Sequence, residues 1–396
     1  MEQTLDRTDS PIRTDARITA AWWGVVALFL VHGLIVSTWV SRIVAIKNGL
    51  RLSDGALGIA LFAAAVGSVT AIPATGWAVT KFGSKRSAQW TSCGFCVSLI
   101  LLACSVNFVT LFAALFVYGA MAGANDVAMN SHAVGIEKLF AKPTMSRFHA
   151  MFSLGGIVGA SIGALLASQG VAPTMHFVLA AAIILGLVAA AAPLMLDTHE
   201  KHEKRARMQF TRPPRALVVL SAIGFCIFLS EGAIADWTAV YIKQVLNGGE
   251  GIAGLGYAVF SAAMTVFRFC GDAITEKLGR AWMIRAGGLV AAFGLTVVVM
   301  ANSPGWALVG FAAAGAGFSS IIPVVFAAGG RVPSVSEAVG VATVSGIGYL
   351  GFLVGPPAIG FVSEFTSLRV GLSMLVVLST AAAILTIAVK DEGPLG

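Results

Sequence analysis

Charged residues are scarce in this 396-residue chain, where they make up 11% of the positions. A soluble protein carries about 25% charged residues, so most of this surface cannot face water. Cysteine is also rare, at five residues, and the CxxC pattern of Cys93 and Cys96 has no second cysteine pair or histidine partner nearby. These shortages exclude a soluble globular domain, and we expect helix packing at the two cysteines, with no metal site and no cofactor.

Sequence signatures of catalysis and nucleotide binding are missing as well. The chain contains no HExxH zinc motif and no GxxxxGK[ST] phosphate-binding loop. No pair of catalytic acids can be assigned to one pocket. We therefore expect a protein that is not an enzyme, and whose energy source is an ion gradient or the gradient of its own solute.

Long apolar runs fill most of the chain, with 57% hydrophobic residues. At roughly 20 residues per membrane crossing, the composition predicts an all-α membrane protein with twelve transmembrane helices in two six-helix halves. The expected helices cover residues 20–45, 56–79, 86–105, 108–136, 146–169, 174–195, 216–244, 252–276, 281–301, 305–329, 336–362 and 367–389.

One polar stretch, residues 197–215, divides these spans six and six. We interpret it as a solvated linker of mixed charge. The predicted organisation is a cytoplasmic N-terminal tail at 1–19, an N-terminal bundle at 20–196, the cytoplasmic linker at 197–215, a C-terminal bundle at 216–390 and a cytoplasmic tail at 391–396.

Lysine and arginine are distributed unevenly between the two ends of these spans. Twenty of the 26 fall in the tails, the linker and the loops on the same side, and four fall in the opposite loops. Positive residues stay preferentially in the cytoplasm, so we expect both termini inside. The net charge of +7 is then a topology signal, and we expect no nucleic-acid partner.

A short basic turn occurs twice, 196 positions apart. The first copy runs from Gly76 to Arg86 and the second from Gly271 to Arg280. A repeat at half the chain length, in a chain this apolar, predicts a duplicated membrane bundle. Transport is therefore the leading functional hypothesis.

Ionisable residues inside the spans need a reason, because each costs about 2.5–3.5 kcal/mol on insertion scales. In the fourth span, Asp126 and Asn130 are four residues apart on one helical stripe, beside Asn125. Such a stripe lines a cavity or contacts another helix. Its amides and carboxylate suit hydroxyls and amines of a small polar solute, and a carboxylic acid in a partly dry cavity is a candidate proton carrier.

The first and seventh spans resemble each other. His32-Gly33 precedes Trp39 in the first, and Glu231-Gly232 precedes Trp237 in the seventh. Corresponding first helices of two halves flank the central cavity of a two-half transporter. The pattern predicts proton sites at His32 and Glu231 and stacking faces at both tryptophans, with an aromatic belt at the membrane interface as the alternative for Trp39 and Trp237.

Arg268 and Asp272 in the eighth span are four residues apart on one face. They can neutralise each other or form a switch between conformational states, because a buried ion pair that exchanges partners is a bistable element. Glu276 continues the same face.

The repeated turn resembles the loop between helices two and three, and between eight and nine, of the major facilitator superfamily. Gly76, Lys81 and Gly83 match in the first copy, which has Thr80 in place of an acid. The second copy keeps the acid as Glu276, with Lys277, Gly279 and Arg280, but has Asp272 in place of the leading glycine. The resemblance implies a clasp that holds the cytoplasmic side shut, to which the Glu276 copy contributes more.

Longer matches resemble the MosC-like branch of that superfamily, which is distantly similar to fucose permeases. They are Trp39-Val-Ser-Arg42-Ile43, Leu52-Ser-Asp-Gly-x-Leu-Gly58, Phe148-His149-Ala-x-Phe152-Ser153-x-Gly-Gly156, Glu231-Gly-Ala-x-x-Asp236-Trp237 and Gly348-Tyr349-x-Gly-Phe-x-x-Gly-Pro-Pro357.

The expected function is alternating-access transport of a small polar solute, sugar- or cyclitol-like, coupled to H⁺ or alternatively to Na⁺, by a monomer in the bacterial inner membrane. Drug or metabolite efflux on the same fold is the main alternative, and a non-transporting receptor is a remote one. The expected substrate-binding residues are Trp39, Asn125, Asn130, His149, Asp236, Trp237 and Tyr349, and the expected proton-coupling residues are His32, Asp126 and Glu231. The expected gating residues are Arg42, Gly76, Lys81, Gly83, Arg268, Asp272, Glu276, Lys277, Gly279 and Arg280.

Overall fold

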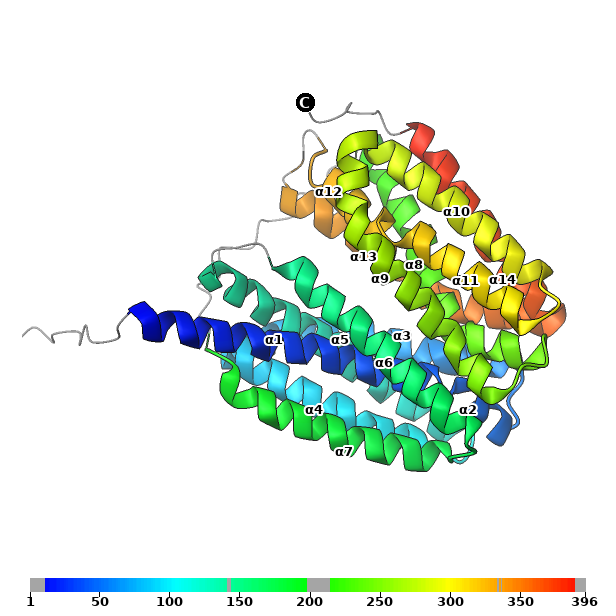
Figure 1. Ribbon diagram of the computed structural model, residues 1–396, viewed down its shortest axis with the longest axis horizontal. Coiled ribbons are helices and arrows are strands. Elements are labelled where there is room, and N and C mark those ends of the chain that lie inside the picture. Colours follow the sequence, from blue (N-terminus) through cyan, green and yellow to red (C-terminus); the bar gives the residue numbers. More distant parts are fainter. Residues whose placement is uncertain (1–10, 141–143, 198–213, 333–334, 336, 389–396) are drawn as a thin grey trace, which may run out of the picture.

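The computed structural model describes residues 11–140, 144–197, 214–332, 335 and 337–388. Every regular element in those residues is a helix (Figure 1). The N-terminal elements are α1 (Pro11–Val40), α2 (Ile43–Gly49), α3 (Asp54–Phe82), α4 (Ser84–Ala103), α5 (Phe108–Phe140), α6 (Met145–Ser168), α7 (Pro173–Ala191) and η1 (Ala192–Leu194). The C-terminal elements are α8 (Arg215–Gln244), α9 (Glu250–Leu278), α10 (Arg280–Met300), α11 (Pro304–Phe318), α12 (Ile321–Gly329), α13 (Glu337–Phe365), α14 (Leu368–Leu385) and η2 (Thr386–Ala388).

The helices match the twelve expected spans, with two interruptions that the sequence pattern does not predict. The first span breaks at Ser41 and Arg42, between α1 and α2, and the tenth breaks at Ser319 and Ser320, between α11 and α12. A break inside a membrane span leaves backbone carbonyls without helical partners, and such carbonyls are tolerated only where protein or water satisfies them. Both breaks are therefore places where a polar side chain can bind the backbone.

By length and composition, eleven helices of the described part can cross a membrane. The expected third span, α4, is a helix of 20 residues but does not meet this criterion. It carries many hydroxyl side chains, and two of them, Thr91 and Ser92, are used in a polar contact inside the bundle. Large apolar side chains on other helices are exposed instead, such as Phe269 at 74%, as expected for surfaces that face lipid.

The two halves pack their helices in the same way. In the N-terminal half α1 packs on α6, α3 on α5, and α4 on α7. The C-terminal half repeats this with α8 on α13, α9 on α11, and α10 on α14. The sequence repeat is therefore a structural repeat of two six-helix halves, drawn in Figure 1 as blue-to-green and green-to-red groups.

The repeated basic turn has the same backbone in both copies. Gly83 ends α3 with φ 85° and ψ 156°, and Gly279 ends α9 with φ 87° and ψ 158°. Each glycine also donates its backbone N–H to the residue four positions earlier. Only glycine adopts this positive φ without strain, which explains why the two turns share a glycine at this position.

The halves contact each other mainly through two helix pairs, α3 with α13 and α6 with α9. In Figure 1 they approach closely at the end that carries α2 and diverge toward the end that carries the start of α1 and α12. We call the first end the closed end. The two cross-half pairs are themselves equivalent under the repeat, since α3 corresponds to α9 and α6 to α13.

Candidate functional site

Three acids and one arginine from the spans lie near the boundary between the halves. Asp126 comes from α5, Glu231 and Asp236 from α8, and Arg268 from α9, and the side chains of all four are partly buried. The electrostatic neighbours of these groups include residues of the opposite half, as described below. The structure therefore brings together residues that the sequence places up to 142 positions apart.

Asp126 forms the contact with Asn130 that their spacing predicts. The amide nitrogen of Asn130 donates to the Asp126 carboxylate at 3.0 Å and to its backbone carbonyl at 2.9 Å. The charge of Asp126 also acts on Tyr349 of α13, in the other half. Tyr349 is 45% exposed and stacks on Phe228 with ring centroids 5.1 Å apart, so an acid of one half is within electrostatic range of an exposed aromatic ring of the other.

Glu231 lies within electrostatic range of Arg268. One of its carboxylate oxygens, Oε1, is buried without a hydrogen-bond partner. Arg268 donates its Nε–H to the carbonyl of Ser319 at 2.9 Å, at the break between α11 and α12. The broken helix thus holds the guanidinium in place while its charge remains available to groups at the boundary.

His149 contributes from the N-terminal side. Its exposed ring lies against Phe29 at 5.1 Å, and it is within electrostatic range of Arg268 across the boundary. The backbone of Asp272 lies in α9, but its side chain is outside the described part, so the predicted pair with Arg268 stays a prediction.

A second polar group lies closer to the closed end and contains two tyrosines that the sequence analysis missed. Asp236 acts electrostatically on Tyr118 of α5 and on Tyr257 of α9. At 1.5 Å per residue, Asp236 lies roughly 8 Å nearer the closed end of α8 than Glu231 does. The chain has only four tyrosines. A polar hydroxyl in the middle of an apolar span was therefore the one sequence feature that could have marked Tyr118 and Tyr257 as candidate site residues.

His32 and Asn125 contact each other inside the N-terminal half. Asn125 Nδ2 lies 3.0 Å from His32 Nδ1, and Asn125 Oδ1 accepts hydrogen bonds from Thr91 at 3.0 Å and Ser92 at 2.8 Å. Asn125 is 0% exposed and His32 is 7% exposed. In this conformation the hydroxyls of α4 hold Asn125 in a helix-packing contact, the alternative to a cavity residue, and its role in substrate binding stays a prediction.

Trp39 and Trp237 are likewise buried. Trp39 is 3% exposed and packs near Tyr118 and Phe177, and Trp237 is 0% exposed. Neither is a belt residue at a membrane surface, and neither presents an open stacking face in this conformation. Their aromatic surface is used for packing within the bundle.

Polar contacts join the halves at the closed end. Lys47 of α2 pairs with Asp54 at 2.7 Å and donates to Gln244 of α8 at 3.0 Å. Glu364 of α13 accepts the backbone N–H of Gly55 at the start of α3, at 2.8 Å. The carboxylate of one half thus caps the positive end of a helix in the other.

Small residues allow the backbones to touch beneath these contacts. A methyl group on Gly58 would lie 2.8 Å from the Pro356 carbonyl oxygen and 3.0 Å from the Cα of Gly360. A methyl group on Gly254 would lie 3.0 Å from the Cα of Ala164. The segment around Gly58 in α3 and the segment around Pro356 in α13 therefore pack directly against each other at the closed end. Helix α13 continues through Pro356 and Pro357 without a break.

The residues expected to gate lie at both ends. Lys81 is exposed and lies over the Trp77 ring at 4.6 Å, and Glu276 and Lys277 are exposed. Arg42 is instead buried near the closed end, where it donates to the Val171 carbonyl. Its Nε and Nη1 have no hydrogen-bond partner in the described structure, and Glu250 of the other half lies within electrostatic range.

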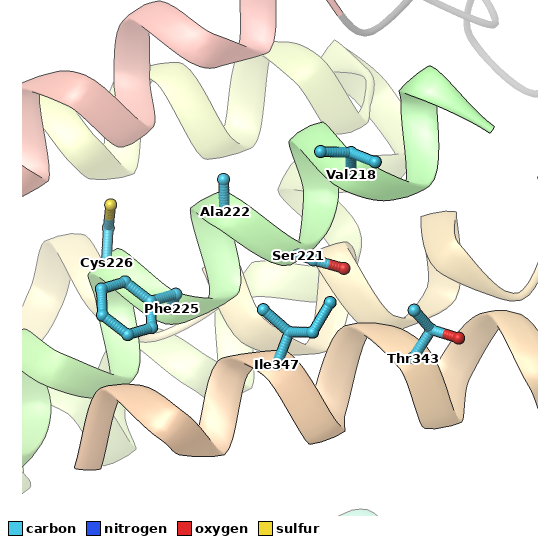
Figure 2. A pocket seen from close by; sticks show the side chains of 7 residues that line it. All are labelled: Val218, Ser221, Ala222, Phe225, Cys226, Thr343 and Ile347. Carbon is cyan, nitrogen blue, oxygen red and sulfur yellow. The ribbon is translucent and has the colours of Figure 1, made fainter. Parts of the chain in front are cut away.

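One surface groove of about 340 Å³ lies between α8 and α13 (Figure 2). Its walls are Val218, Ser221, Ala222, Phe225 and Cys226 on α8, with Thr343 and Ile347 on α13. No charged side chain and none of the predicted site residues lines it. The polar cluster at the boundary is therefore the better candidate site.

Comparison with known proteins agrees with this architecture. The sequence matches the Major Facilitator Superfamily over residues 21–328 and again over 220–395. It is 35% identical to an uncharacterized MFS-type transporter of Yersinia pestis, over 90% of this chain and 92% of that protein. It is also 29% identical to the membrane protein MosC of Rhizobium meliloti, over 90% of this chain and 86% of MosC.

Solved structures share the fold at low sequence identity. The nucleoside transporter NupG superposes with a TM-score of 0.76 at 11% identity, covering 92% of this chain and 98% of NupG. A bacterial homologue of the human lysosomal transporter Spinster, inward-facing and occupied, superposes with a TM-score of 0.71 at 14% identity, covering 96% and 97%. With the duplicated bundle and the sequence matches together, the chain belongs to the major facilitator superfamily, as a multi-pass membrane transporter of its MosC-like branch.

Proposed function

We propose that this protein moves a small polar solute, sugar- or cyclitol-like, across the bacterial inner membrane by alternating access, coupled to protons. The substrate binds at the boundary between the halves, and Asp126 and Glu231 carry the proton. The observation that carries this proposal is the placement of three partly buried acids together with Arg268 near the boundary between the two halves.

The surroundings of two of these acids support proton coupling. Asp126 is held by Asn130 and lies within electrostatic range of Tyr349 of the other half, and Glu231 has one unpartnered carboxylate oxygen. An acid without a fixed partner can exchange a proton when access changes from one side to the other, and intramembrane acids are typical of proton relays. Asn130 and His149 add hydrogen-bonding groups for the solute.

Alternating access also accounts for the uneven contact between the halves. The closed end carries the loops with few positive residues, and the diverging end carries the start of α1, the end of α14 and the basic turns. Under the positive-inside rule, the closed end faces outward and the structure is an inward-facing state. The Spinster homologue with a TM-score of 0.71 is also described as inward-facing.

Reconstituted transport tests this proposal. Purified protein in proteoliposomes should accumulate myo-inositol or D-glucose when an inward proton gradient is imposed. Asp126→Asn and Glu231→Gln should each reduce gradient-driven uptake by at least tenfold, while Asp197→Asn, which removes an exposed acid outside the helices, should leave it unchanged. If both site variants transport like the parent, the proton-coupling mechanism is wrong.

Export on the same fold is the second candidate. The exposed Tyr349, close to Phe228 and Phe352, offers an aromatic face on which a planar ring can stack. Export predicts that ethidium leaves loaded proteoliposomes in exchange for protons and that Tyr349→Ala slows this exit. Uptake of a polyol without ethidium exit would favour the first candidate.

A further inference from the structure

The first basic turn, at the junction of α3 and α4, carries aromatic rings beside its charges. Lys81 Nζ lies 4.6 Å from the centroid of the Trp77 ring and 5.3 Å from that of Phe82. The Phe82 ring meets Trp77 at 5.8 Å and Trp90 at 5.3 Å between centroids, edge to face in both cases. We call the side chains of Trp77, Lys81, Phe82 and Trp90 the aromatic-basic patch.

The patch is open to its surroundings. Trp77 and Trp90 are each 56% exposed, and Lys81 is exposed as well. Along the same face of α4, seven and eleven residues after Trp90, Val97 and Leu101 are also exposed, and such an apolar stripe faces lipid in a membrane protein. A tryptophan at the end of a lipid-facing stripe lies at the level of the headgroups, so lipid, rather than a soluble molecule, surrounds the patch.

The charges around the patch have one sign. The cations of residues 76–90, a segment without any acid, are Lys81, Lys85 and Arg86. Thr80 stands where the second turn has Glu276, and its hydroxyl donates to the Trp77 carbonyl of its own helix at 2.6 Å. An ammonium group has three donors and can bind an anion while it lies over a ring. The segment itself supplies no such anion.

The second basic turn shows that the shared backbone does not require these side chains. The glycines of the two turns have nearly the same φ and ψ. The three aromatic positions of the first turn, shifted by 196 residues, carry small or aliphatic side chains in the second, namely Ala273, Leu278 and Ala286. Residues 272–286 also contain two acids beside their three cations. The rings and the uncompensated charge are therefore specific to the first turn.

We propose that the aromatic-basic patch binds the headgroup of one anionic phospholipid. The Lys81 ammonium donates to the lipid phosphate, and the exposed rings of Trp77 and Trp90 pack against the glycerol backbone and the first methylenes of the acyl chains. Three cations without an acid favour a headgroup with net negative charge over a zwitterionic one, because each cation is attracted to anionic lipid. The assignment goes beyond the proposed function and does not depend on which solute is transported.

Native mass spectrometry of the purified full-length protein tests this site, with dioleoyl-phosphatidylglycerol and dioleoyl-phosphatidylcholine as probes. The parent should bind phosphatidylglycerol more tightly than phosphatidylcholine, by about fivefold or more. Lys81→Gln should weaken phosphatidylglycerol binding by about fivefold, the effect of one cation. Lys81→Arg should keep the affinity, because a guanidinium retains both the charge and the contact with the ring. Trp77→Leu should weaken the binding of both lipids.

Lys277→Gln is the matched control. Lys277 occupies the position of Lys81 in the second turn, beside Glu276 and without the aromatic rings. This variant should bind phosphatidylglycerol like the parent. Lys81 and Lys277 are both exposed, so the thermal midpoints of both variants in lipid-free detergent should equal that of the parent, and a change in lipid affinity then reports the site itself.

Four outcomes would overturn the proposal. The first is Lys81→Gln binding phosphatidylglycerol as tightly as the parent, and the second is a parent without preference for the anionic lipid. The third is an equal loss in Lys81→Gln and Lys277→Gln, since net charge alone would then explain the binding. The fourth is displacement of the lipid by an equal concentration of glycerol 3-phosphate, which would make the patch a site for free phosphate esters.

Discussion

Lys47 of the N-terminal half and Gln244 of the C-terminal half share a hydrogen bond of 3.0 Å at the closed end. Lys47 is only 4% exposed and also pairs with Asp54, at 2.7 Å. The bond therefore joins the two halves through a nearly buried cation. Any movement that opens this end must break it.

Removing the Lys47 charge should favour opening at this end. We expect Lys47→Met to raise labelling of a Ser261→Cys reporter by an impermeant thiol reagent from outside by about fivefold, the effect of roughly 1 kcal/mol. The exposed native Cys93, Cys104 and Cys270 would first be changed to serine.

Lys243→Met is the control. It removes a nearby charge that, among the described residues, forms no hydrogen bond or ion pair with the other half, and it should change labelling little. Equal labelling in both variants would show that the Lys47 contacts do not hold this end shut.

A methyl group at Gly58 should disrupt the same closure by steric overlap. Gly58→Ala is expected to clash with the Pro356 carbonyl and the Cα of Gly360 and to slow transport severalfold by destabilising the inward-facing state. Gly186→Ala is the control, because nothing lies within 4 Å of a methyl group there, and it should stabilise its helix by about 0.5–1 kcal/mol. Initial uptake rates and thermal midpoints would be compared, and normal transport by Gly58→Ala would contradict the prediction.

The two asparagines of α5 should separate stability from transport. Asn125→Ala leaves buried partners on α1 and α4 unpaired, so the free energy of unfolding should fall by about 1–3 kcal/mol, with the apparent solute affinity kept. Asn130→Ala should instead reduce that affinity and cost less stability, because its described bonds go only to Asp126. Thermal unfolding and concentration-dependent uptake distinguish the pair, and the reverse pattern would restore Asn125 as a cavity residue.

The two basic turns should differ in how they hold the opposite, outward-open state. Glu276→Gln is expected to raise labelling of the Ser261→Cys reporter from the cytoplasmic side, because the acid of this copy would no longer clasp that side. Thr80→Val, in the copy without an acid, should have a smaller effect, since the Thr80 hydroxyl donates to the Trp77 carbonyl of its own helix. The hypothesis fails if Glu276→Gln leaves labelling at the parent level.

Part of the site could be recognised from residue type alone. Asp126, Glu231, Asp236 and Arg268 are conspicuous in apolar spans, because each is costly there, and the structure does bring them to the boundary between the halves. Asn125 satisfies the same criterion, yet it is turned into the bundle toward Thr91 and Ser92. Which way a side chain faces depends on the rotation of its helix against its neighbours, and periodicity does not specify that rotation here.

The tyrosines were missed for a related reason. Tyr118 and Tyr257 read as ordinary aromatic residues of apolar helices, and only the tertiary structure brings both within electrostatic range of Asp236. The breaks after α1 and α11 were also unpredicted, because Ser41 and Ser319 carry no strong helix-breaking signal. The carbonyl of Ser319 is nevertheless what positions Arg268.

Composition and local pattern were sufficient for the twelve spans, the duplication and the glycine turns at Gly83 and Gly279. These follow from short-range physics, namely the cost of exposing polar backbone to lipid and the freedom of glycine at positive φ. The contact of Lys47 with Gln244 and the cap of Glu364 on Gly55 required the tertiary structure. Each joins one half to the other, and only the packing of the two halves brings such distant residues within range.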